Sequence, residues 1–197
     1  SETTAYRPPR FMWYPETQFC YMRSGNMFLA AKGGHNNESH NHNDVGTCIL
    51  AIDNVPLLID AGVGTYTKKT FSSERYTIWT MQSNYHNLPI INGQPESFGT
   101  QYHATQVRAN EKRCIFTADI AKAYPEEAAV DSWIRAYQLQ KNRLVITDDY
   151  RLKMKKAPNQ LNFMTWGNVD ISEKGRIKLH INKVKATLSY DANVFKP

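Results

Sequence analysis

The sequence predicts an all-β protein, a large antiparallel sandwich of stacked sheets with few or no helices. Short runs rich in β-branched and aromatic residues recur along the chain, and turn residues typical of hairpins separate them. No helical periodicity exceeds about three turns. Only the segment 119–129, which Pro125 interrupts, could contain a short helix. All 197 residues are therefore expected to form a single β-sandwich domain.

The first part of the chain predicts an extended lead-in followed by a hairpin. Residues 1–16 are rich in proline and aromatic side chains, which predicts an extended segment without regular structure. Two strands, 19–23 and 27–32, flank Ser24-Gly25-Asn26, where the glycine suits a turn that needs a positive φ.

A second hairpin is predicted from two apolar runs, 48–52 and 55–60, that enclose Asp53-Asn54. A two-residue turn there pairs Ile52 with Val55 and places Asp60 opposite Thr47. The segment after Asp60 reads as a long polar and aromatic loop, and such loops are disproportionately functional. Further strands are predicted over 88–91, 102–109, 112–118, 132–139, 144–152, 161–166, 176–181 and 184–190.

Composition and charge exclude some classes of protein. The formal net charge of +6 favours polyanionic partners weakly. Basic residues that alternate with apolar ones at 151–155 and 174–178 are interpreted as solvated sheet faces rather than binding surfaces. We find no nucleic-acid module, membrane span or signal peptide, and the missing initiator methionine suggests a processed or excised chain. The three cysteines, Cys20, Cys48 and Cys114, are predicted to be buried free thiols.

The segment 33–44 concentrates chemically active side chains, because it holds three of the six histidines. His42 of this segment, with Asp60 and His86, forms a predicted zinc site, since zinc takes nitrogen and oxygen donors from separate loops. An extended chain from the second hairpin back to His42 would span roughly 16 Å, so the segment 40–44 must fold back over the end of the hairpin. Three protein donors would leave a fourth position open, which is typical of a catalytic zinc.

Several nearby residues are candidates for contact with a substrate. Tyr66 and Tyr76 could act as an acid, as a base or as a platform on which a sugar stacks. Glu38 could contact the substrate or, like His35, orient a ligand imidazole, although loop polar residues often do neither. His40 is not itself a predicted ligand, but only Asn41 separates it from the predicted ligand His42.

A cupin-like metalloenzyme is an alternative, because Gly34, followed after five residues by His-Asn-His at 40–42, matches the opening of the cupin metal motif. The rest of the motif does not match. Gly46 stands where a cupin has glutamate, and Ile90 stands where a cupin has asparagine.

Several segments together form a longer and more specific pattern. They are GGH at 33–35, HNHNDVG at 40–46, LLIDAGVGTY at 57–66, YHN at 85–87, TADIAKAYPEEA at 117–128, WIR at 133–135 and TDDY at 147–150. With the linked His42, Asp60 and His86, these segments resemble the C-terminal domain of the heparinase II/III-like polysaccharide lyases. The resemblance covers roughly residues 18–170.

The resemblance implies a stacked β-sandwich behind an N-terminal α/α toroid, in enzymes that cleave uronic-acid polysaccharides by β-elimination. It implies that the zinc on His42, Asp60 and His86 is mainly structural, which reverses the open-site interpretation. It also makes His40 the best catalytic candidate, with Tyr76 second. The toroid, which carries the family's principal tyrosine base, is absent from these 197 residues, so the chain alone is expected to lack lyase activity.

The expected partners follow from the same resemblance. They are an acidic polysaccharide of the heparin or heparan sulfate kind and the toroid of the parent chain. The resemblance also implies a periplasmic or cell-surface location in a bacterium. A non-catalytic carbohydrate-binding or scaffolding module, in which zinc only ties down loops, remains an alternative.

Overall fold

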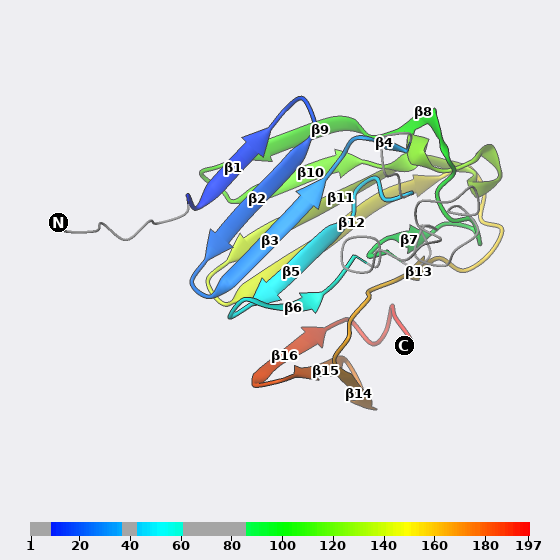
Figure 1. Ribbon diagram of the computed structural model, residues 1–197. Helices are drawn as coiled ribbons and strands as arrows, with labels where there is room; N and C mark the ends of the chain where they lie inside the picture. Colours follow the sequence, from blue (N-terminus) through cyan, green and yellow to red (C-terminus); the bar gives the residue numbers. More distant parts are fainter. Residues whose placement is uncertain (1–8, 37–42, 61–85) are drawn as a thin grey trace, which may run out of the picture.

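The computed structural model describes residues 9–36, 43–60 and 86–197, and it confirms the predicted all-β sandwich (Figure 1). Two antiparallel sheets form the body of the fold and stack face to face. The five-stranded sheet contains, in spatial order, β1 (Phe11–Tyr14), β2 (Phe19–Ser24), β3 (Met27–Lys32), β5 (Cys48–Ile52) and β6 (Val55–Leu58). The four-stranded sheet contains β12 (Arg143–Leu152), β11 (Val130–Gln140), β10 (Ile115–Asp119) and β9 (Thr105–Asn110).

Three smaller sheets flank this body. They are β14 (Asn168–Glu173), β15 (Arg176–Ile181) and β16 (Val184–Ser189); β7 (Pro89–Ile90) with β13 (Gln160–Leu161); and β4 (His35–Asn36) with β8 (Gly99–His103). The three-stranded sheet lies beside β6 at the bottom of Figure 1.

The described residues contain only two helical turns, both of the 3-10 type. These are η4 (Ala121–Ala123) and η5 (Glu126–Ala128), and they confirm the short helical segment predicted within 119–129. Among the described residues, no helix has the length and apolar character needed to cross a membrane.

The hydrophobic core lies between the two large sheets. Alternate residues of β11 are buried, as expected for a strand with one face turned inward. Trp133 and Tyr137 from this face join Phe116 of β10 and Leu29 of β3 in one cluster. Trp13 of β1 also packs on Phe116, with 5.9 Å between ring centroids. Burying each such side chain contributes about 1.5–3 kcal/mol.

The two predicted hairpins are present. Ser24 pairs with Met27 across a turn in which Gly25 has a φ of 57°, and Ile52 pairs with Val55. The predicted placement of Asp60 opposite Thr47 is wrong. The register shifts between Leu50 and Ala51, and β6 ends at Leu58, so Asp60 follows the strand instead of pairing within it.

Other sequence predictions need correction. Residues 11–14 are not an irregular lead-in, because they pair with β2 as strand β1. The strand predicted at 161–166 is reduced to Gln160–Leu161, and the one predicted at 102–109 is divided between β8 and β9. Strand β14 was not predicted. The basic alternation at 151–155 does not lie on one strand, because β12 ends at Leu152. The cysteines are buried and free, as predicted.

Candidate metal centre and its supporting networks

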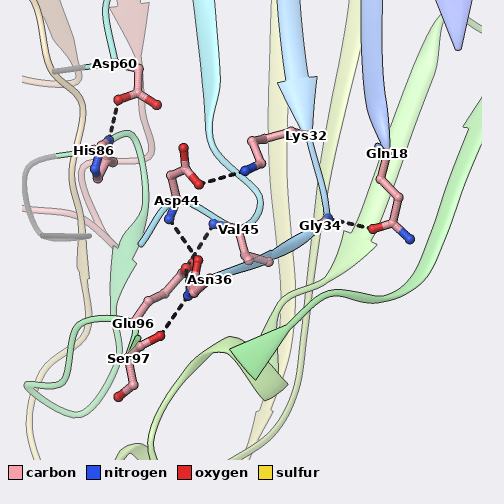
Figure 2. A network of polar contacts seen from close by, with 10 residues as sticks. All are labelled: Gln18, Lys32, Gly34, Asn36, Asp44, Val45, Asp60, His86, Glu96 and Ser97. Carbon is pink, nitrogen blue, oxygen red and sulfur yellow. Dashed lines mark hydrogen bonds and ion pairs between the residues drawn. The ribbon is translucent and has the colours of Figure 1, made fainter. Parts of the chain in front are cut away.

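Two of the three predicted zinc ligands lie together (Figure 2). The Oδ1 atom of Asp60 is 2.5 Å from Nδ1 of His86, and the two side chains are 3% and 0% exposed. Asp60 follows β6 and His86 precedes β7, so the chain brings the pair together across a separation of 26 positions in sequence. The other predicted site residues lie outside the described residues; they are His42, His40, Glu38, Tyr66 and Tyr76.

The charge of Asp60 controls the protonation of His86. Burial has the largest single effect and lowers the pKa of the imidazole, but the charge and the hydrogen bond of the adjacent Asp60 both act in the opposite direction, and the net result is a pKa above the ordinary value. Asp44 raises this pKa further, and Lys32 lowers it. The Asp60–His86 pair is therefore within electrostatic range of the residues that close the histidine-rich segment.

A buried polar network joins the two ends of the segment 37–42 (Figure 2). Asn36, which precedes the segment, accepts a hydrogen bond at Oδ1 from the backbone N–H of Asp44, at 3.1 Å. Asn36 Nδ2 donates to Glu96 Oε1 at 3.0 Å and to the Ser97 carbonyl at 2.9 Å. Lys32 Nζ is 2.8 Å from Asp44 Oδ1. Asn36 and Asp44, which flank the segment, are thus held together by protein contacts alone.

Glu96 is the centre of this network. Its Oε1 also accepts the backbone N–H of Val45 at 2.9 Å. Burial raises the pKa of Glu96 well above its ordinary value, although the bonds from Asn36 and Val45 act in the opposite direction. Burial therefore shifts Glu96 toward the neutral carboxyl relative to an exposed glutamate.

A second buried network starts at Asn87, directly after His86. Asn87 Nδ2 donates to the carbonyls of Cys48, at 2.7 Å, and Ile59, at 3.1 Å. Its Oδ1 accepts the backbone N–H of Met164 at 2.6 Å. The Asn87 side chain therefore ties β5, the residue before Asp60 and Met164 to the residue that follows His86, which holds the Asp60–His86 pair in place.

Arg135 supports Asn87 from the core. Its Nη1 donates to the Asn87 carbonyl at 2.9 Å, while Nε and Nη2 contact the two Asp148 oxygens at 2.8 and 2.7 Å. Trp133 Nε1 also donates to Asp148, at 2.8 Å. The Arg135 and Asp148 side chains are 1% and 8% exposed, so this is a buried, bidentate ion pair.

Sequence reasoning assigned no site role to Asn36, Asn87, Glu96, Arg135 or Asp148. A signal existed for Arg135, because it occupies an inward position between Trp133 and Tyr137 in a strand that alternates regularly. His35, considered as an orienting residue, lies in β4, where its backbone pairs with His103 of β8.

The chemistry of the pair suits zinc, which accepts imidazole nitrogen and carboxylate oxygen. Within 9–36, 43–60 and 86–197, no three His, Cys, Asp or Glu side chains are grouped to hold a metal, so a third donor to a zinc on this pair would have to come from another part of the chain. Donors about 2.0–2.1 Å from a tetrahedral zinc lie about 3.3 Å apart, so Asp60 and His86 would separate by roughly 0.8 Å to share one.

Comparison with known proteins decides the family. The profile of the family described as "Heparinase II/III-like, C-terminal" matches residues 7–193. The chain belongs to this family. The match includes Asp60, His86 and both supporting networks, and it confirms the resemblance found in the sequence.

Solved structures show the same fold. A heparan sulfate lyase HepC mutant from Pedobacter heparinus superposes with a TM-score of 0.64 and 17% identity, over 90% of this chain and 28% of that chain. Heparinase III superposes with a TM-score of 0.59 and 17% identity, over 89% and 28%. The chain thus spans little more than a quarter of the length of these lyases. A search of curated proteins finds no match.

Proposed function

We propose that this heparinase II/III-like domain is the zinc-stabilised β-sandwich of a polysaccharide lyase that cleaves uronic-acid polysaccharides of the heparin or heparan sulfate kind by β-elimination. The observation that carries the lyase class is the family match over residues 7–193. The buried Asp60–His86 pair supports the metal. We further propose a periplasmic or cell-surface location in a bacterium.

His42, Asp60 and His86 would hold the zinc. His42 precedes Asp44 by two residues, a stretch that spans at most about 7 Å. Asp44 is anchored through Asn36 and acts electrostatically on His86, which supports the proposal that His42 joins the pair. The ion would be bound by one residue from each of three segments far apart in sequence, and it would stabilise the folded domain by holding these segments together.

His40 is the proposed catalytic residue of the domain, with Tyr76 second and with Tyr66 and Glu38 as substrate contacts. β-Elimination removes the C5 proton of the uronate and breaks the C4–O bond as a C4–C5 double bond forms. One group must accept the proton, another must donate one to the leaving oxygen, and donors near the carboxylate must offset its charge. An N-terminal α/α toroid in the parent chain would supply the principal base.

The test is His40→Ala in a chain that carries the toroid, with His180→Ala as the matched control because His180 is exposed on β15. We expect His40→Ala to lose at least about 100-fold in turnover, measured by the ultraviolet absorbance of unsaturated uronate products. Thermal unfolding should not change in either variant.

Unchanged turnover in His40→Ala would contradict the catalytic role and favour a carbohydrate-binding or scaffolding module. The 197-residue chain alone is expected to release no unsaturated product. Robust release by that chain would show that the toroid is not required.

A further inference from the structure

Residues of the β2–β3 and β11–β12 turns line a hollow of about 660 Å³. Both turns lie at the lower left of Figure 1. Three basic residues line it from three different parts of the chain. They are Arg10, before β1; Arg23, at the end of β2; and Lys141, in the β11–β12 turn. Ser24 and Gln140 add neutral hydrogen-bonding groups to the lining.

Other residues hold the two guanidinium groups. Arg10 Nη2 is 3.4 Å from Sγ of the buried Cys114, and the Arg10 carbonyl accepts the backbone N–H of Arg23 at 2.8 Å. The Arg23 guanidinium lies 4.5 Å from the centroid of the Phe28 ring. Because these contacts restrict both side chains, less conformational entropy is lost when they bind a ligand.

The local charge favours an anion. None of the described residues that line the hollow is acidic. The turn that ends at Cys114 carries Lys112 and Arg113 against Glu111. Arg143 begins β12 directly after the Lys141 turn, and Asp53 lies in the β5–β6 turn. Asp53 already accepts a hydrogen bond from Asn26 at 3.0 Å. A concave, basic surface raises the local concentration of anionic ligands.

We propose that this hollow binds the sulfate or carboxylate groups of an acidic saccharide. Guanidinium groups match such oxyanions because two parallel N–H donors face two oxygens. The hollow is near Met27 at one end of β3, whereas Lys32 and the metal centre are at the other end, about 17 Å away along the strand. It would therefore be a contact for the polymer apart from the Asp60–His86 pair.

The ligand class rests on the proposed function, but the test needs no turnover. A short, size-defined heparin oligosaccharide is titrated calorimetrically into the 197-residue chain, an R10Q/R23Q variant and an R176Q/K178Q control. The control removes the same charge from exposed positions on β15. We expect R10Q/R23Q to bind at least about tenfold more weakly, and the control to change less than about threefold.

Equal losses in the two double variants would overturn the proposal, because they would indicate general charge attraction. Displacement of the oligosaccharide by inorganic sulfate at the same concentration of sulfate groups would overturn the saccharide assignment in favour of a small-anion site. If R10Q/R23Q does not fold, Lys141→Gln in the exposed turn replaces it. We expect about threefold weaker binding, and unchanged binding would overturn the proposal.

Failure here leaves the lyase proposal intact, because turnover of the toroid-bearing chain tests that proposal separately. Loss of turnover in His40→Ala with unchanged binding of the oligosaccharide would likewise separate the two proposals.

Discussion

Removal of the Asp148 carboxylate should severely destabilise the domain. In the native fold, Asp148 receives two bonds from Arg135 and one from Trp133, all between 2.7 and 2.8 Å. Asp148→Ala deletes all three and leaves the Arg135 guanidinium charged in a position that is 1% exposed. The Asn87 carbonyl, at 2.9 Å, cannot neutralise that charge.

The magnitude follows from the burial of this pair. Removing one partner of a buried ion pair costs about 3–5 kcal/mol, because the remaining charge stays desolvated. For a domain of this size, that corresponds to a fall in Tm of about 6–20 °C. Arg135 also supports Asn87 beside His86, so we expect zinc affinity to fall about tenfold as well.

Urea denaturation and thermal unfolding of Asp148→Ala measure this cost. The matched control is Asp149→Ala, the exposed neighbour in β12, which should change stability by no more than about 0.5 kcal/mol. A loss below about 1 kcal/mol in Asp148→Ala, or a loss equal to that of the control, would refute the reasoning that the pair holds the core and the metal centre together.

Three further predictions concern the same networks. Burial raises the pKa of Glu96 in the folded protein above its ordinary 4.5. Above that pH, the unfolded chain releases this proton more readily than the folded protein does, so ionisation of Glu96 favours unfolding. In urea denaturation, Glu96→Gln should therefore gain stability relative to wild type as the pH rises above 4.5, and a difference independent of pH would contradict this. Gly46→Ala should lower the free energy of unfolding by about 1–3 kcal/mol, because φ is +87° and the new Cβ would lie 2.6 Å from Ile120 Cγ2. The control Gly25→Ala, whose new Cβ meets no close atom, should lower it less in the same assay. Asn87→Ala removes three side-chain hydrogen bonds and should cost at least about 3 kcal/mol in thermal unfolding, and retention of the wild-type Tm would contradict its bridging role.

The parts of the fold predicted correctly are those that local chemistry determines. The turns at Gly25, Asp53-Asn54 and Asn92-Gly93 have positive φ values, which these residue types tolerate, and the flanking strands follow from them. Strand β1 was missed because its four residues lie among prolines, and only its pairing with β2 makes it regular. Strand β14 was missed although Val169 and Ile171 alternate with polar residues in it, because two apolar positions in six residues are too few to distinguish a strand from a loop.

The candidate site divides in the same way. Asp60 and His86 were identified because each ends or begins a recognisable segment and carries a ligand chemistry, and the structure brings them together. The role of Glu96 was not predictable, because its bond to Asn36 joins residues 60 positions apart. No local pattern indicates that a polar side chain will be buried against such a distant partner.

The most direct test of the zinc-stabilised domain is the zinc content of the purified 197-residue chain, measured by elemental mass spectrometry beside Asp60→Ala and the control Asp149→Ala. We expect about one zinc per chain in the wild type and the control. Asp60→Ala should lose the metal and unfold at a lower temperature, because a ligand bound only to the folded state adds to its stability. Absence of zinc from the wild-type chain, or its retention in Asp60→Ala, would show that His42, Asp60 and His86 do not share a metal.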